Sequence, residues 1–314
     1  MHALIERLLA ERPVITDGAW GTELQKRGLE PGSPPDAWNL AHPERVEAVA
    51  RNYVEAGSRL ILTNTFQANR VALDRYGFGE RVREINRAGV EISRRAAGDR
   101  AYVFASVGPT GRLLAAGETS DAELRETFAE QVEALAEAEP DGLVIETMSD
   151  PEEAKCAVLA ARATGLPIVA CMAFDSGRDR TRTMMGTTPR EASAILTAAG
   201  ADVIGANCGQ GIEGYLRIFR ELAGAIGCPT WLKPNAGEPE LVGFETLYRT
   251  TPAEFAAGAA ALVQAGAVFI GGCCGTTPEF ISALNRELHR ETKGIACTGS
   301  VRRRAAPTPN LGRH

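Results

Sequence analysis

Three cysteines in the second half of the chain have the spacing of a metal site. Cys273 and Cys274 are adjacent, and Cys208 precedes Cys273 by 65 positions. A disulfide between adjacent cysteines would be strained, whereas three thiolates suit Zn²⁺ and leave its fourth tetrahedral position open, as in a catalytic site. The residues alone also leave open that all three cysteines are buried and act as small apolar side chains.

The elements that would position these cysteines alternate between strand and helix patterns. Strands separated by helices predict a parallel sheet, and eight such units predict a (β/α)8 TIM barrel in a single domain. An open doubly wound sheet is the alternative, but no G-x-G-x-x-G sequence follows a strand. The short apolar runs that predict strands are 13–17, 59–63, 101–107, 142–146, 167–173, 201–206, 229–233 and 267–272.

Three segments repeat the same helix-to-strand pattern. Residues 55–64, 199–208 and 265–274 each contain a helix end, a glycine, a short apolar strand and then a polar or sulfur-bearing residue. Glycine is typical of a helix C-terminus, where the chain turns through a left-handed conformation. The apolar segment 255–274 is therefore expected to be an Ala-rich helix that leads into a buried strand, and not a membrane span.

Helix starts are marked by capping-box sequences, in which a Ser or Thr precedes a Glu by three positions. We expect such boxes at Ser149 with Glu152, Thr188 with Glu191, and Thr251 with Glu254.

Polar and sulfur-bearing residues follow the predicted strands at their C-terminal ends, where the active sites of such barrels lie. The sixth and eighth strands should be near neighbours, so we expect the three thiols to converge there. The strand-end residues are Asp17 to Trp20, Asn64-Thr65, Gly108-Pro109, Glu146-Thr147, Asn207-Cys208, Pro234-Asn235 and Cys273-Cys274.

The composition is that of an ordinary folded protein. Its 314 residues are 44% hydrophobic and 24% charged, which excludes disordered, collagen-like and coiled-coil classes. A net charge of −6 argues against a nucleic-acid partner. Charged residues interrupt the N-terminal apolar stretch, so no signal peptide is expected. Seven cysteines without a disulfide pattern favour a reduced, cytoplasmic protein. We expect the barrel to occupy residues 1–296 and a basic, flexible tail 297–314.

The strand-end motifs resemble the zinc-dependent homocysteine S-methyltransferase family. The paired cysteines with an upstream Asn-Cys, in this order and spacing, are the most specific of these motifs, and the resemblance covers roughly residues 10 to 290. The matching sequences are Gly-Ala-Asn-Cys208, Gly-Gly-Cys-Cys-Gly-Thr-Thr-Pro278, Asp17-Gly-Ala-Trp-Gly-Thr-Glu-Leu24, Leu62-Thr-Asn-Thr-Phe66, Gly108-Pro-Thr-Gly111 and Lys233-Pro-Asn-Ala-Gly237.

The resemblance implies that Cys208, Cys273 and Cys274 bind zinc and that zinc binds the thiol of homocysteine, which accepts a methyl group to give methionine. Coordination to zinc deprotonates a thiol whose ordinary pKa is near 8.5. Asn235 is a candidate for an exchangeable fourth ligand, although an asparagine after a proline is also an ordinary turn residue.

The resemblance also implies contacts for the amino-acid end of homocysteine. Asp17 and Glu146 would hold the ammonium group through charge-assisted hydrogen bonds, and the backbone amides of Gly18 and Ala19 would meet the carboxylate. The structural alternatives are a turn residue for Asp17 and a helix N-terminal charge for Glu146.

The methyl donor is less clearly indicated. Relatives that use betaine surround its quaternary ammonium with aromatic rings, but two of the matching positions here hold Gln67 and Thr147, and Trp38 remains at a third. The motifs look more similar to the homocysteine module of cobalamin-dependent methionine synthase, so we expect methylcobalamin, free or on a separate corrinoid protein. Betaine or S-methylmethionine is the alternative. Trp20, Asn64 and Asn207 are further candidates for the donor side or the site floor.

Two other function classes compete with methyl transfer. A zinc hydrolase or lyase is disfavoured, because three thiolates make zinc a weak Lewis acid and no histidine or spare acid is expected beside Cys208. A non-catalytic barrel that stores zinc or binds a corrinoid protein remains an alternative.

Overall fold

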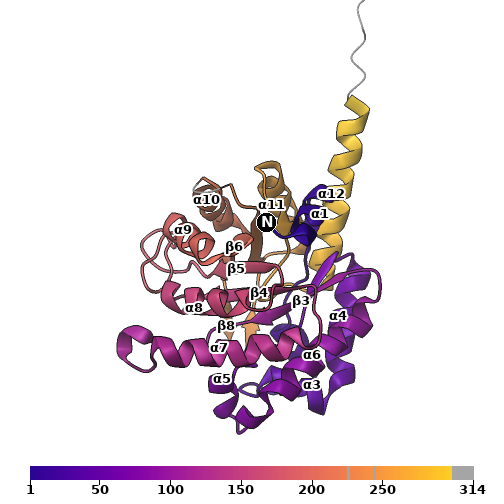
Figure 1. The fold of residues 1–314 in the computed structure, drawn as a ribbon. Helices are drawn as coiled ribbons and strands as arrows, with labels where there is room; N and C mark the ends of the chain where they lie inside the picture. The colour runs from indigo at the N-terminus through magenta and orange to yellow at the C-terminus, as the bar shows by residue number, and fades with distance from the viewer. Residues whose placement is uncertain (225–226, 244, 299–314) are drawn as a thin grey trace, which may run out of the picture.

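The computed structural model describes residues 1–224, 227–243 and 245–298. Eight parallel strands form one sheet in the order β1-β10-β7-β6-β5-β4-β3-β2, and helices surround it (Figure 1). Each strand overlaps a predicted apolar run, so the predicted (β/α)8 TIM barrel is confirmed. The strands are β1 (Val14–Ile15), β2 (Leu60–Leu62), β3 (Tyr102–Val107), β4 (Gly142–Met148), β5 (Ile168–Met172), β6 (Val203–Gly211), β7 (Thr230–Asn235) and β10 (Phe269–Ile270).

The barrel closes between β1 and β2 through isolated hydrogen bonds instead of a strand ladder. The backbone N–H of Arg59 donates to the carbonyl oxygen of Ile15 over 2.8 Å. The N–H of Leu62 donates to the Oδ2 atom of Asp17, also over 2.8 Å. A side chain that was predicted to bind substrate therefore takes part in closing the barrel.

Twelve α-helices connect and cover the strands in the described part of the chain. They are α1 (Ala3–Ala10), α2 (Gly21–Gln25), α3 (Trp38–Ala41), α4 (Pro43–Ala56), α5 (Arg70–Asp74), α6 (Val82–Ala97), α7 (Asp121–Ala136), α8 (Pro151–Arg162), α9 (Pro189–Ala199), α10 (Ile212–Ala223), α11 (Pro252–Gln264) and α12 (Pro278–Thr298). The predicted Ala-rich helix and buried strand within 255–274 are α11 and β10. Among the described residues, no helix has the length and apolarity needed to cross a bilayer.

The long helix α12 projects beyond the barrel in Figure 1. It runs to Thr298, so it contains the first two residues of the predicted tail. The rest of that tail, residues 299–314, lies outside the described residues.

Local signals place most helix ends where the sequence predicts them. Capping boxes begin α9 at Thr188 and α11 at Thr251. The predicted box at Ser149 is wrong, because the side chain of Asp150 caps α8 and accepts from the N–H of Glu152 over 2.9 Å.

The glycines of the three repeated segments adopt the predicted left-handed conformation. Gly57 after α4 has a φ of 104°, Gly200 after α9 has 107°, and Gly266 after α11 has 112°. A side chain at these positions would clash with the backbone, and glycine avoids that cost.

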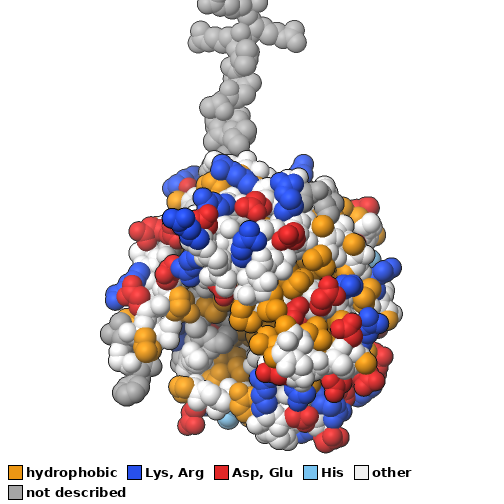
Figure 2. All heavy atoms as spheres, turned by 90° about the vertical axis from the view of Figure 1, so that its left-hand side faces the viewer, with side chains coloured by type: hydrophobic (Ala, Val, Ile, Leu, Met, Phe, Trp, Pro, Cys, Tyr) orange, Lys and Arg blue, Asp and Glu red, His pale blue; other side chains and the backbone are white. Residues whose placement is uncertain are grey.

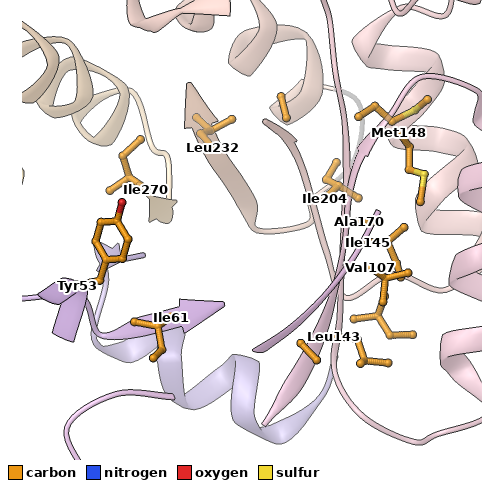
Figure 3. Close-up of a cluster of buried hydrophobic side chains, with 14 of the residues drawn as sticks. Tyr53, Ile61, Val107, Leu143, Ile145, Met148, Ala170, Ile204, Leu232 and Ile270 are labelled. Carbon is orange, nitrogen blue, oxygen red and sulfur yellow. The ribbon is translucent and has the colours of Figure 1, made fainter. Parts of the chain in front are cut away.

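Side chains alternate along the strands between the barrel interior and the surrounding helices. On β7, Trp231 packs in the interior, while Leu232 packs outward in the larger cluster shown in Figure 3. Helix α1 adds Ile5 and Leu8 to the interior cluster. The strand residues of that cluster are Val14, Leu60, Leu62, Phe104, Val144, Val169, Cys171, Val203, Trp231 and Phe269.

A short antiparallel hairpin follows β7 and was not predicted. Its strands are β8 (Glu240–Val242) and β9 (Glu245–Leu247). The hairpin places Thr246 and Tyr248 at the C-terminal end of the barrel, where both line the cavity described below.

Candidate active site

A cavity of about 420 Å³ lies at the C-terminal ends of the barrel strands. Figure 2 shows a hollowed face with hydrophobic side chains in the hollow and with acidic and basic side chains interspersed around it. Most of the predicted site residues form part of the cavity wall. They are Gly18, Ala19, Trp20, Asn64, Gln67, Glu146, Cys208, Cys273 and Cys274.

The three predicted cysteines converge at one side of this cavity. The Sγ atoms of Cys208, Cys273 and Cys274 all lie within 4.8 Å of one another, and those of Cys208 and Cys274 are 3.8 Å apart. Strand β7 separates β6 from β10, so the sixth and eighth barrel strands are near neighbours as predicted. The other cysteines with described side chains, Cys156, Cys171 and Cys228, do not join the cluster.

Mutual repulsion and burial oppose ionisation of the clustered thiols. Hydrogen bonding to Cys273 lowers the pKa of the Cys208 thiol, but hydrogen bonding to Cys274 and burial outweigh it and raise that pKa to about 12. Hydrogen bonding to Cys208 lowers the pKa of the Cys274 thiol, but hydrogen bonding to Cys273, repulsion from Cys273 and burial outweigh it and raise that pKa to about 12. A cation among the three sulfurs would reverse this balance, since coordinated thiols are deprotonated.

Asn235 lies between two residues whose backbone groups bond the paired cysteines, Pro234 and Ala236. Asn235 is 4% exposed, and its Oδ1 atom has no hydrogen-bond partner among the described residues. The residues on either side of Asn235 bond the backbone of the paired cysteines. The N–H of Cys273 donates to the carbonyl oxygen of Pro234 over 2.8 Å, and the N–H of Ala236 donates to the carbonyl oxygen of Cys274 over 2.9 Å. The three clustered thiols form a donor set that fits Zn²⁺ and leaves its fourth position open.

Glu146 lines the cavity at the end of β4, where burial raises its pKa above the ordinary value. Lys233 and the hydroxyl group of Ser106 act on the pKa in the opposite direction. Ser106 donates a hydrogen bond to Oε1 of Glu146, and Asn207 donates a longer one of 3.4 Å to Oε2. The carboxyl group therefore has capacity for a further donor from the cavity.

Asn207 lies between Glu146 and the thiol cluster and contacts both. Its amide oxygen accepts from the N–H of Thr147 over 2.7 Å, and its Nδ2 atom lies 2.6 Å from the Thr147 hydroxyl and 3.9 Å from Sγ of Cys273. Thr147 and Cys208 have φ angles of 59° and 61°, a strained conformation for residues other than glycine. Both strained residues thus contact Asn207: Thr147 through hydrogen bonds and Cys208 as the next residue in the chain.

Asp17 has a different environment from the one predicted. It is fully buried and does not form part of the cavity wall. Its Oδ1 atom pairs with the ammonium group of Lys233. Its Oδ2 atom accepts from the indole N–H of Trp20 and the N–H of Leu62, each over 2.8 Å. Asp17 thus makes its contacts within the protein, and its direct contact with a substrate ammonium group stays a prediction.

One of the two predicted anion-binding amides is also occupied. The N–H of Ala19 donates to the backbone oxygen of Thr276 over 3.3 Å and to its hydroxyl over 3.2 Å. The amide of Ala19 is thus hydrogen-bonded within the protein, and its contact with a substrate carboxylate stays a prediction. Gly18 has no room for a side chain, because a Cβ atom there would lie 2.8 Å from the Tyr53 ring.

The three positions that would form an aromatic cage for a methyl donor do not form one in this cavity. Gln67 and Thr147 line the wall, whereas Trp38 is buried away from it and packs edge-on against His42. Other aromatic side chains, Trp20, Phe66 and Tyr248, do line the cavity.

Two polar residues of the cavity wall, Asn64 and Asp36, support the loop after β2. Asn64 uses its amide N–H groups on the backbone oxygen of Pro35 and on Asn39, over 2.8 and 2.9 Å. Asp36 accepts from the N–H of Gln67 over 3.0 Å, and burial raises its pKa to about 7 despite two backbone hydrogen bonds.

Several residues of the site were missed by the sequence analysis. Lys233 could have been found from the sequence, because strand alternation places it on the same interior face as Trp231. A charged side chain on an interior face indicates a functional site. Ser106 occupies the equivalent place on β3, two residues after Phe104. Tyr248 has no such signal, since the unpredicted hairpin positions it.

Comparisons with known proteins agree on one family. A family model described as homocysteine S-methyltransferase matches residues 14–288. Methionine synthase of Mycobacterium tuberculosis is 33% identical over 298 residues, which cover 87% of this chain and 24% of that protein. Betaine–homocysteine S-methyltransferase 1 of Danio rerio is 30% identical, over 92% of this chain and 76% of that protein. The chain spans about a quarter of the length of the methionine synthases it matches.

Solved structures give the same result. The oxidized form of the homocysteine methyltransferase MmuM from Escherichia coli superposes with a TM-score of 0.77 at 27% identity, covering 91% of this chain and 99% of that one. The metallated form of the same protein superposes with a TM-score of 0.76 at 26% identity, covering 90% and 99%.

Proposed function

The chain belongs to the homocysteine S-methyltransferase family, and from that premise we propose that it transfers a methyl group to the thiol of homocysteine and forms methionine. One observation carries the proposal: Cys208, Cys273 and Cys274 converge at the wall of a cavity large enough for an amino acid. A storage barrel would have no need for the carboxylate and ammonium groups that line the same cavity.

Zinc is the metal that this donor set suits best. Cys208, Cys273 and Cys274 would hold it, and the unpaired Oδ1 atom of Asn235 would be the exchangeable fourth ligand. When bound, the metal would supply the positive charge that keeps a substrate thiol ionised at neutral pH. Three thiolate ligands leave little Lewis acidity for activating water, which argues against a hydrolase.

Besides one proton transfer, the reaction forms one bond to the methyl carbon and breaks another. The acceptor thiol loses its proton to solvent, its sulfur bonds to the methyl carbon, and the bond between that carbon and the donor breaks with the electron pair leaving on the donor. The described residues bind and orient the acceptor. Glu146 would accept from its ammonium group, and the backbone N–H of Gly18 would meet its carboxylate.

Methylcobalamin, free or on a separate corrinoid protein, is the donor we propose. The support is the resemblance of the strand-end motifs to the homocysteine module of cobalamin-dependent methionine synthase, and the presence of Gln67 and Thr147 where betaine users have aromatic rings.

A donor with a positive charge, such as betaine or S-methylmethionine, is the second candidate. Trp20, Phe66 and Tyr248 line the cavity together with the buried carboxyl group of Asp36. Aromatic faces and a carboxylate attract an onium group.

The test supplies the zinc-loaded protein with homocysteine and, in parallel, methylcobalamin, betaine or S-methylmethionine, and measures methionine. Turnover with methylcobalamin alone would support the donor that we propose, and turnover with an onium donor alone would replace it. If no donor yields methionine and zinc-edge spectroscopy shows no added sulfur on mixing with homocysteine, the transferase function is excluded.

A further inference from the structure

Tyr248 lies beside the thiol cluster, directly after strand β9 of the hairpin that follows β7. Its side chain lines the cavity together with Cys274. Its ring covers Gly275, the residue after the paired cysteines, and a Cβ atom at Gly275 would lie 2.3 Å from the ring. Gly275 has a φ of 79°, which glycine adopts without strain. The chain thus leaves room for an aromatic ring directly against the paired cysteines.

The hydroxyl group of Tyr248 forms a hydrogen bond with the thiol of Cys274. A phenol has one O–H donor and keeps its proton at neutral pH, so it donates to a thiolate that has lost its own. A donated hydrogen bond stabilises the charge on the sulfur. It therefore holds the sulfur of Cys274 in place and makes this sulfur a weaker nucleophile.

Each sulfur of the cluster has a donor from outside the cluster. The backbone N–H of Gly209 bonds to the sulfur of Cys208, and Nδ2 of Asn207 lies 3.9 Å from the sulfur of Cys273. These two donors are on β6, on either side of Cys208. The donor to Cys274 comes instead from the hairpin, a segment outside the repeat of strands and helices. Hydrogen bonds of this kind orient metal ligands and tune their reactivity.

A methyl donor in this cavity meets more than one nucleophile. Under the proposed function the acceptor is a thiolate on the metal, and Cys208, Cys273 and Cys274 would be thiolates on the same metal. All three line the cavity that the donor must enter. A ligand sulfur that took the methyl group would become an uncharged thioether, which is not among the usual ligands of zinc. The site therefore needs a feature that separates the acceptor from its own ligands.

We propose that Tyr248 protects Cys274 from methylation, because its hydroxyl group holds the Cys274 sulfur and leaves the methyl group to the acceptor. The inference rests on the proposed function, because it concerns a sulfur that competes with the acceptor of that reaction. In the reaction that Tyr248 suppresses, the Cys274 sulfur bonds to the methyl carbon, and the bond between that carbon and the donor breaks with the electron pair leaving on the donor. Tyr248 is thus a positioning residue that acts through Cys274.

The alternative is that Tyr248 contributes only an aromatic face to the cavity wall, where it would attract a positively charged donor. The variant Tyr248→Phe separates the two roles, because it keeps the ring over Gly275 and removes the hydroxyl group. Tyr215→Phe is the matched control. The hydroxyl group of Tyr215 donates to the backbone oxygen of Cys208 over 2.8 Å, so it bonds the backbone of a cluster residue instead of a sulfur.

The test treats the zinc-loaded protein with iodomethane, which supplies a methyl group and releases iodide, and locates the methylated cysteines by peptide mass spectrometry. We expect Tyr248→Phe to raise the initial rate of methylation at Cys274 about 3- to 10-fold, the part of a charge-assisted hydrogen bond that is expressed in nucleophilicity. The rate at Cys273 should stay at the wild-type value, and Tyr215→Phe should leave both rates unchanged.

The cobalt-loaded protein gives a second readout. Loss of a hydrogen bond raises the energy of the sulfur lone pair, so the sulfur-to-cobalt charge-transfer band of Tyr248→Phe should move to longer wavelength than in wild type and in Tyr215→Phe. An unchanged rate at Cys274, an equal increase at Cys273 or in Tyr215→Phe, or an unmoved band would overturn the role of Tyr248 while the proposed function stands. Failure of the wild-type protein to bind zinc or cobalt would overturn both.

Discussion

The two ends of the barrel are built from the same strands but have opposite chemistry. At the N-terminal end the interior is apolar and is covered by α1; two residues further along, the same interior face becomes polar. Phe104 is followed by Ser106 on β3, Val144 by Glu146 on β4, and Trp231 by Lys233 on β7. Each strand contributes both an apolar and a polar side chain to the barrel interior, since residues i and i+2 share a face.

Stability and chemistry are thus separated along the strand direction. Burial of apolar side chains at one end supplies stabilising free energy. The other end holds features that cost free energy: the buried ion pair of Asp17 and Lys233, the clustered thiols, and left-handed backbone at Thr147 and Cys208. Variants at the two ends should therefore change different observables.

The largest expected effect is the loss of a clustered thiol. Cys273→Ala should lower kcat/KM for methyl transfer at least about 10³-fold, because several kcal/mol of charge stabilisation are lost with the metal. Bound zinc, measured by mass spectrometry of the metal, should fall to background.

Cys171→Ala is the matched control at the apolar end. Cys171 is 1% exposed in the interior cluster, so its truncation should reduce the free energy of unfolding by about 1 kcal/mol and leave zinc content unchanged. Loss of zinc in both variants, or in neither, would contradict the separation of the two ends.

A truncation at the apolar end should have the opposite signature. Phe104 is fully buried and stacks against Trp231 with ring centroids 6.4 Å apart. Phe104→Ala should lower the free energy of unfolding by about 3–5 kcal/mol, measured by urea denaturation, and should leave the affinity of the folded protein for zinc unchanged. Phe66→Ala at the cavity wall should lower the free energy of unfolding by less than Phe104→Ala does. An equal decrease in the two variants would show that both ends stabilise the barrel alike.

A smaller effect is expected at the carboxylate of the polar end. Glu146→Gln should weaken homocysteine binding about 10- to 100-fold, because a neutral amide replaces the partner of the ammonium group. Burial raises the pKa of Glu146, so wild-type affinity should weaken as pH falls through that raised value, and titrations across pH should show this step only in the wild-type protein. A variant with the same pH profile would rule out Glu146 as the partner.

The same pKa shift has a consequence for stability. The folded state holds the proton of Glu146 more tightly than the unfolded state does, so folding is opposed as pH rises from the ordinary pKa to the raised one. Relative to wild type, Glu146→Gln should gain stability over that pH window. The gain in unfolding free energy would measure what the buried Glu146 costs the fold, whereas the loss of homocysteine affinity measures its role in binding.

What the sequence determined by itself was the barrel and the place of its chemistry. Apolar runs, capping threonines such as Thr188 and left-handed glycines such as Gly57 act over a few residues, so their outcome follows from local sequence. Eight repeated units then bring Cys208 beside Cys273 and Cys274, since equivalent strand ends meet at one end of the barrel.

Only the tertiary structure decided which partners the polar groups take. Asp17 and Lys233 are 216 positions apart and meet across the barrel, and the amide of Ala19 is used by Thr276, 257 positions away. Such pairings depend on the tilt, register and closure of all eight strands together. The sequence therefore determined that charged groups and thiols gather at this end, and the closed barrel decided which of them remain available to a substrate.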